Sequence, residues 1–428
     1  MSDSIPPMAN ETPFQLSENA PVNFEFISNA EQPLSDAEQP LSDAEQPLSD
    51  AEQPLSTRKR PKRKRTNWPL LTIAICLVGV YILYVFALPE IQVAIFRSRF
   101  PKKFIPPELA LKGSTRTLLR TCEFLFVGWF FYLGASIGSF LNVVAGRMPE
   151  GRTIVFGGSK CPYCDTRLSF LDNTPVLGWL LVQGKCRTCR LPIAPRYLMI
   201  EVVIGAIFVW IGLWELVSSG SNLPHWDSSG RSGLTSLVLF TQWQLIAAAL
   251  SHAGMFAVLI MLGVANEGRK PFPILPFLVM AAAVASPKIF NPSLDFVSWT
   301  EPFQRSLISK LGPIANPLVS ILLGVLSGLG LGWISSFWIA KRPNSIVERH
   351  WILQCFLIGS VLGWQSVVTI VLCSLIVYGM TRSLWSSRSV SIQSFQSVEA
   401  FVPSMCLIGI CMLHHSLWRQ IAYLIGIV

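Results

Sequence analysis

Residues 124–146 of this 428-residue chain read FLFVGWFFYLGASIGSFLNVVAG and contain no charged side chain. About 20 apolar residues are enough for an α-helix to cross the hydrocarbon core of a bilayer. Residues 67–89 form a similar uncharged run, which is too long and too far from the first residue to be a signal peptide. Both stretches therefore predict transmembrane helices.

The rest of the chain continues this pattern. Further apolar runs occupy residues 197–218, 233–266, 271–287, 312–340, 351–380 and 400–428, and the longer ones leave room for two helices. The sequence is 51% hydrophobic and only 14% charged, which excludes an ordinary water-soluble globule. Because the runs do not alternate as barrel strands do, we expect an all-α, polytopic transmembrane helix bundle of about eight or nine spans. Small residues between Gly324 and Gly332 predict close helix packing.

Residues 1–66 have a different composition. Residues 30–56 repeat the heptapeptide AEQPLSD, and each repeat has a proline and one large apolar residue, which rules out a coiled coil and predicts a disordered tail. Residues 58–65 read RKRPKRKR just before the first apolar run. A basic run in this place favours a juxtamembrane anchor over a nucleic-acid patch and predicts a cytoplasmic N-terminus.

The topology follows from the first two spans. An extra N-terminal helix at 67–89 leaves the cytoplasm, the connecting segment 90–123 follows, and the span at 124–146 returns the chain. The basic, turn-rich loop 147–196 then faces the cytoplasm, as the positive-inside rule expects. The connecting segment is also basic and is an exception to that rule.

The loop contains two Cys-x2-Cys pairs, Cys161 with Cys164 and Cys186 with Cys189, separated by 21 residues. Two thiolates on one turn can bind one metal ion, and two such turns complete a tetrahedron. Four ligands leave no open position, so we predict a structural zinc ion. The alternative is a pair of disulfides, which a reducing cytoplasm disfavours. The other six cysteines lie in or beside apolar runs, where cysteine behaves as a small hydrophobic residue.

Motifs around the cysteines carry a family resemblance: Gly138-Ser-Phe-Leu-Asn142, Arg147-Met-Pro149, Asp172 to Trp179, Gly184 to Cys189, Arg196-Tyr197 and Glu201. Over residues 124–215 the chain resembles the N-terminal domain of the type IV prepilin leader peptidase and N-methyltransferase family. These bacterial inner-membrane enzymes cleave and then methylate prepilins and the pseudopilins of type II secretion. Leu198 departs from the proline usual in the family. The resemblance implies that residues 216–428 form a degenerate peptidase-like bundle.

The resemblance also implies an aspartic protease within the membrane, whose two carboxylates share a proton. Val264 and Trp351 occupy the expected aspartate positions, and beyond Ser228 the only aspartate is Asp295. Glu267 and Glu348 lie near the two positions. We interpret them as solvated loop charges, because an added methylene displaces a carboxylate by more than catalytic geometry tolerates. The sequence therefore gives no catalytic residue.

Two functional hypotheses remain. In the first, the chain is a family member without endopeptidase activity that serves as a binding or assembly partner of prepilin-like proteins in the bacterial inner membrane, with no nucleic-acid partner. In the second, it is an active prepilin peptidase or N-methyltransferase. S-adenosylmethionine is implied only if methyl transfer is retained. The sequence gives no role for residues 288–311 or for the heptapeptide repeats.

Overall fold

The computed structural model describes residues 68–101, 113–154, 158–161, 163–223, 243–268, 270–290, 315–339, 345–386 and 395–424. The predicted disordered tail, Asp295 and most of the segment 288–311 lie outside these residues. The regular secondary structure of the described part is helical apart from two isolated β-bridges in the cysteine loop, which otherwise consists mainly of turns and irregular segments. The predicted all-α class is therefore confirmed.

The N-terminal helices extend beyond the predicted spans. Helix α1 (Trp68–Ile82), the π-helical turn η2 (Leu83–Ala87) and α2 (Leu88–Arg99) follow one another without a break, and α4 runs from Gly113 to Arg147. Most of the predicted connecting segment 90–123 is therefore helical.

Side chains from that segment join the two helical arms. Glu90 forms an ion pair with Arg116 at 2.7 Å, and Arg120 donates to Gln92 at 3.0 Å and also pairs with Glu123. Arg116 and Arg120 are two of the basic residues that make this segment an exception to the positive-inside rule, and each is paired with a neighbouring carboxylate.

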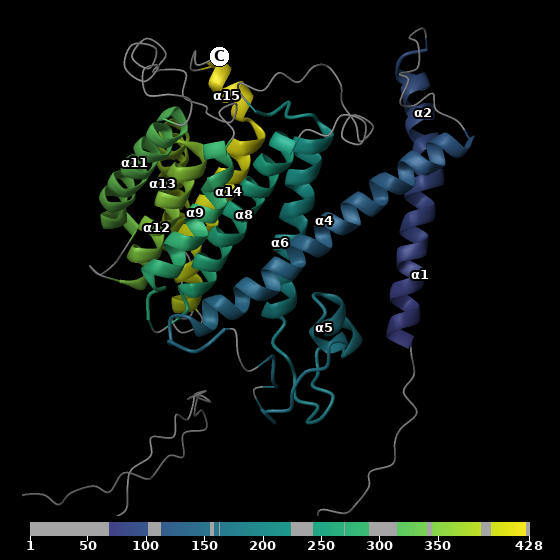
Figure 1. The fold of residues 1–428 in the computed structure, drawn as a ribbon, viewed down its shortest axis with the longest axis horizontal. Helices are drawn as coiled ribbons and strands as arrows, with labels where there is room; N and C mark the ends of the chain where they lie inside the picture. Colours follow the sequence, from purple (N-terminus) through teal and green to yellow (C-terminus); the bar gives the residue numbers. More distant parts are fainter. Residues whose placement is uncertain are drawn as a thin grey trace, which may run out of the picture. The chain divides into compact units, whose positions relative to one another are not determined.

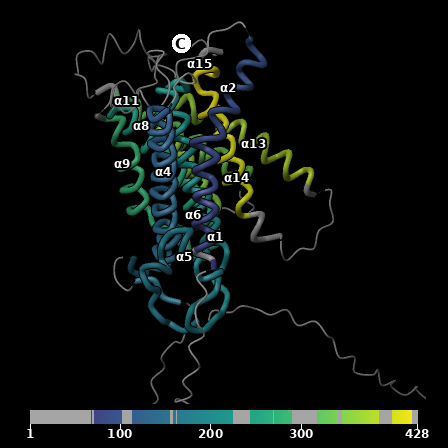
Figure 2. Tube along the Cα trace, turned by 90° about the vertical axis from the view of Figure 1, so that its right-hand side faces the viewer, coloured from purple at the N-terminus to yellow at the C-terminus, as the bar shows by residue number. Residues whose placement is uncertain are grey.

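The remaining helices form the bundle drawn in Figures 1 and 2. They are α6 (Arg196–Ile211), the π-helical η4 (Gly212–Val217), α8 (Trp243–Ala265), α9 (Ile274–Phe290), α11 (Ala315–Ile339), α12 (Ile346–Leu362), α13 (Trp364–Ser386), α14 (Phe395–Ser416) and α15 (Trp418–Leu424). Helix α8 packs against α4, α6, α9, α12 and α14. It therefore provides the common surface on which the bundle assembles.

In the described residues, six helices are long and apolar enough to cross a membrane. They cover Leu71–Arg99, Gly113–Arg147, Arg196–Val217, Trp243–Ala265, Pro317–Ile339 and Trp364–Leu384, and two shorter apolar helices cover Ile274–Ile289 and Ala400–Ser416. The predicted run 351–380 is divided between α12 and α13 at Gly363, whose φ of +90° suits glycine. The chain is a multi-pass membrane protein.

The small residues of α11 allow its backbone to touch that of α12. A Cβ added at Gly324 would lie 1.9 Å from the carbonyl oxygen of Gly359, and one added at Gly328 would lie 2.4 Å from that of Cys355. The prediction that these glycines serve close packing is confirmed. In lipid, such backbone approach replaces the hydrophobic drive that holds helices together in water.

We predict that Gly324→Ala destabilises the bundle by about 1–3 kcal/mol, because the new methyl group has to displace the α12 backbone. The measurement is thermal unfolding of the detergent-purified protein. Gly330→Ala is the matched control, since nothing lies within 4 Å of a Cβ at that position of the same helix. Equal melting temperatures for the two variants would contradict the close packing.

Candidate functional site

The first cysteine pair lies on a tight turn that begins at Cys161. The backbone N–H of Cys161 donates to the Thr166 carbonyl, and the N–H of Asp165 donates to the Cys161 carbonyl, both at 3.0 Å. Asp165 takes a positive φ of 51°, which reverses the chain directly after Cys164. The turn thus holds both sulfurs on one side.

The second pair repeats this arrangement. The N–H of Cys186 donates to the Leu191 carbonyl at 2.9 Å, and the N–H of Arg190 donates to the Cys186 carbonyl at 3.0 Å. Arg190, which directly follows Cys189, has a positive φ of 62°. Two equivalent turns therefore present two cysteines each.

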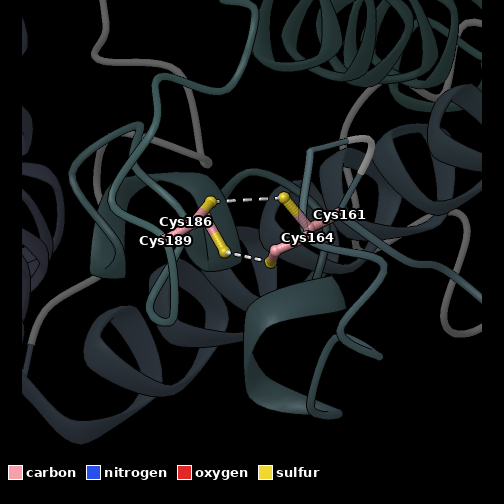
Figure 3. A group of neighbouring side chains, drawn as sticks. All are labelled: Cys161, Cys164, Cys186 and Cys189. Carbon is pink, nitrogen blue, oxygen red and sulfur yellow. Dashed lines mark hydrogen bonds between the residues drawn. The ribbon is translucent and has the colours of Figure 1, made fainter. Parts of the chain in front are cut away.

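Figure 3 shows the two turns facing each other across the four sulfur atoms. The Sγ atoms of Cys161 and Cys189 are 3.8 Å apart, as are those of Cys164 and Cys186. Both separations are longer than the S–S bond of a disulfide, about 2.05 Å, and all four cysteines are free thiols in the structure. A tetrahedral ion with metal–sulfur bonds of about 2.3 Å would place its sulfurs about 3.8 Å apart. The structure thus brings the four predicted ligands together in a cluster that could bind a metal ion.

Local hydrogen bonds lower the pKa of two thiols in this cluster, whereas burial and hydrogen bonds with the other three cysteines raise the pKa of Cys189 to about 12. Hydrogen bonds with Thr166 lower the pKa of Cys164 to about 6. The backbone N–H groups of Cys189 and Thr188 lower the pKa of Cys186, and the Thr188 N–H lies 3.4 Å from its sulfur. The thiolate is the form of cysteine that binds metals.

The segment between the two pairs attaches the loop to the bundle. It contains the short helices η3 (Leu171–Asn173) and α5 (Leu177–Leu181). Glu201, buried on α6, accepts a hydrogen bond from the Val176 N–H at 2.7 Å, and Arg187 forms an ion pair with Asp172. These motif residues hold the two cysteine turns in place.

The two positions expected to hold catalytic aspartates carry apolar side chains. Val264, near the end of α8, is partly buried against the hydrophobic core. Trp351 on α12 is 1% exposed, and its indole N–H donates to the Ser335 hydroxyl at 2.8 Å. Neither position can supply a carboxylate.

A buried network of neutral polar groups joins α8, α12 and α14 close to these positions. Asn266 Oδ1 lies 2.7 Å from His350 Nδ1, and the Asn266 amide donates to the Ser404 hydroxyl at 3.1 Å. Ser404 donates to Gln354 Oε1 at 3.1 Å, and the Gln354 amide donates to the Leu259 carbonyl at 3.0 Å. This network was not predicted from the sequence. The indication that the sequence offered was the presence of amide and imidazole side chains within or beside apolar runs.

The two glutamates near the expected positions do not form a pair. Glu267 is partly exposed and forms an ion pair with Arg196. Glu348 lies in the first turn of α12, where its N–H donates to the capping Ser345 hydroxyl at 3.2 Å. Within the described residues, no hydrogen bond joins the two carboxylates. The interpretation as a solvated loop charge is wrong for Glu348, which lies in α12 and whose Oε2 is buried without a hydrogen bond among the described residues. That neither glutamate is catalytic stays a prediction.

A second polar cluster was also missed from the sequence. Glu215, His252 and His415 come from three separate apolar runs and meet in the interior of the bundle. The sequence offered one indication of this cluster. A glutamate and two histidines lie within predicted membrane spans, where ionisable residues are rare and often functional.

Comparison with known proteins bears on the family resemblance. The family model described as "Bacterial Peptidase A24 N-terminal domain" matches residues 132–215. A prepilin leader peptidase/N-methyltransferase of Klebsiella pneumoniae is 41% identical over 249 residues, covering 57% of this chain and 88% of that protein. The chain belongs to the prepilin leader peptidase/N-methyltransferase family. The resemblance found in the sequence is therefore confirmed.

Two further family members differ in how much they cover. A Dickeya chrysanthemi protein of the same name is 25% identical over 301 residues, or 65% of this chain and 88% of its own length. A Myxococcus xanthus protein, also of that name, is 43% identical over 84 residues, or 20% of this chain, and the chain spans only 25% of its length. No solved structure matches the chain.

Proposed function

We propose that this family member has no aspartic endopeptidase activity and acts in the membrane as a binding or assembly partner of prepilin-like proteins. The observation that carries the proposal is the neutral polar network of Asn266, His350, Gln354 and Ser404, which lies where two carboxylates are required. Aspartic proteolysis needs one carboxylate to activate water and another to protonate the carbonyl oxygen.

The histidine of this network is not a free general base. His350 Nε2 accepts a hydrogen bond from the Phe272 N–H at 2.9 Å, so its Nδ1 carries the proton and donates to Asn266 Oδ1. Both ring nitrogens are therefore engaged inside the protein. Because every member of the network has a partner, it stabilises the contact between α8, α12 and α14 without requiring a catalytic role.

The alternative is an active prepilin peptidase or N-methyltransferase. The cysteine loop and α6 retain the family motifs from residues 132 to 215, which favours the methyl-transfer branch of this alternative over the peptidase branch. S-adenosylmethionine would be required in that case.

We assign zinc to the cysteine loop, with Cys161, Cys164, Cys186 and Cys189 as its ligands. The sulfur separations of 3.8 Å support this choice, since they equal the edge of a zinc–thiolate tetrahedron. With four protein ligands the ion is structural. It supplies the cohesion that a loop of this size cannot obtain from an apolar core.

We predict that the purified protein binds about one zinc ion through the loop, and that Cys161→Ser or Cys186→Ser removes this ion because three thiolates bind zinc far more weakly. Elemental analysis of the detergent-purified protein provides the measurement. Cys373→Ser is the control, since Cys373 is an exposed thiol on α13. A wild-type protein with oxidised cysteines and no zinc in the loop would contradict the assignment.

For the topology, we propose an inner-membrane protein whose N-terminus and cysteine loop are cytoplasmic. The basic run at 58–65 precedes α1, and the contact between α1 and α5 in the cysteine loop supports a topology in which the start of α1 and the loop share one side. The basic loop 147–196 has the composition expected of that side.

We predict that a topology reporter fused between residues 160 and 190 is active only as a cytoplasmic fusion, and that one fused near residue 105 is active only outside. The measurement is the activity of two reporters, such as alkaline phosphatase and green fluorescent protein, each fused at both positions. The opposite pattern would reverse the proposed orientation.

We predict that the chain does not cleave a prepilin leader in membranes in which a typical family member does. Loss of the carboxylate pair removes general acid and general base together, at a cost of at least about 10²–10⁴ in rate. The assay follows the size of a pseudopilin substrate, with Glu267→Gln and Glu348→Gln tested in parallel. Cleavage that disappears in either variant would establish a glutamate-dependent protease and reject the proposal. Cleavage in the wild type and in both variants would also reject it.

A further inference from the structure

Glu215, His252 and His415 form a buried cluster at the junction of η4, α8 and α14. Glu215 Oε1 lies 2.5 Å from His252 Nδ1 and 2.7 Å from His415 Nε2, and the two ring nitrogens are 3.3 Å apart. The side chains of Glu215 and His415 are fully buried, and that of His252 is 4% exposed. One carboxylate oxygen thus faces two imidazole nitrogens in the interior.

The local backbone directs Glu215 into this junction. Helix α6 widens into a π-helix at Gly212–Val217, and such segments often occur at functional sites. The turn that follows is fixed by a bond from the Gly220 N–H to the Glu215 carbonyl at 2.7 Å. Asn222 in turn binds the His415 carbonyl at 3.4 Å, which joins the end of η4 to α14.

The hydrogen bonding within the cluster is incomplete. Glu215 Oε2 and His415 Nδ1 are buried and make no hydrogen bond in the described part of the chain. A buried polar atom without a partner is costly in an apolar interior. The rings of Trp210, Phe256 and Trp418 lie around His415 at centroid distances of 5.4, 6.1 and 6.0 Å and contribute to that interior. A purely structural ion pair gives no reason to bring a second imidazole to the same carboxylate oxygen.

A metal ion accounts for the arrangement. Two imidazole nitrogens bound to a tetrahedral ion at about 2.0–2.1 Å lie about 3.3–3.4 Å apart, which matches the 3.3 Å between His252 Nδ1 and His415 Nε2. Two histidines and one carboxylate are a ligand set of divalent transition metals. Glu215 would have to withdraw by less than about 1 Å to bind such an ion, whose metal–oxygen bonds are about 2.0–2.2 Å.

We propose that Glu215, His252 and His415 bind one divalent transition-metal ion, such as Zn²⁺ or Co²⁺, that links η4, α8 and α14. This site is separate from the cysteine loop. Glu215 lies 19 residues after Arg196 at the start of α6, which is roughly 25–30 Å along a helix. Figures 1 and 2 show α15, which follows α14, at the end of the bundle opposite α5. The proposal is independent of whether the chain cleaves or methylates prepilins.

Metal content of the full-length protein in detergent tests the proposal. After equilibration with Zn²⁺ and removal of loosely bound ion, the wild type should contain two equivalents. His252→Ala and Glu215→Gln should each lose one, and Cys161→Ser should lose the other. His414→Ala is the matched control, because His414 is a buried neighbour of His415 that makes no contact with Glu215 among the described interactions. It should keep both equivalents.

Cobalt distinguishes the two sites without altering the cluster. In a Cys161→Ser background, one bound Co²⁺ should give visible d–d absorption without the intense near-ultraviolet thiolate band, and Zn²⁺ should raise the melting temperature. This Co²⁺ measurement still tests the proposal if the His252→Ala and Glu215→Gln variants do not fold. Absence of bound Co²⁺ in that background, or equal metal content in wild type and His252→Ala, would overturn the proposal.

Discussion

Lipid offers no hydrogen-bond partner to a buried polar group, and this constraint governs the whole bundle. The backbone satisfies it by forming helices over most of the described parts of the predicted spans. The polar side chains that remain must find partners on neighbouring helices, as Trp351 does with Ser335 and Asn266 does with His350. Each such bond also fixes how two helices are rotated relative to one another, so a small number of polar residues specifies the packing of many apolar ones.

These polar residues gather at two levels of α8 with different chemistry. Near its C-terminal end, Asn266 takes part in a network whose bonds use neutral donors and acceptors. About 21 Å away along the helix, His252 belongs to a charged cluster in which buried atoms of Glu215 and His415 make no hydrogen bond. Every side chain of the first network has a hydrogen-bond partner within the protein. The second requires something further, and a metal ion meets the requirement.

The cysteine loop solves a different problem, because it lies outside the spans and is too small to bury an apolar core of its own. Its two turns have matching backbone hydrogen bonds and positive φ angles at Asp165 and Arg190, and the four sulfurs lie within 4.8 Å of one another. The hydrogen bond from Val176 to Glu201 then attaches the loop to α6. In this way the loop, which lies within the residues matched by the family model, is attached to the bundle.

Local sequence determined the helices, the four-cysteine cluster and the missing aspartates, because apolar run length, Cys-x2-Cys spacing and residue identity are properties of short segments. It did not determine where α4 begins, since Arg116 is accommodated only by its pairing with Glu90 on another helix. Nor did it show that Glu215 meets His415, 200 residues later. Contacts of that kind depend on how the helices pack and rotate against one another. Only the tertiary structure decides them, because the spacing of residues along one helix contains no information about which partner will face it.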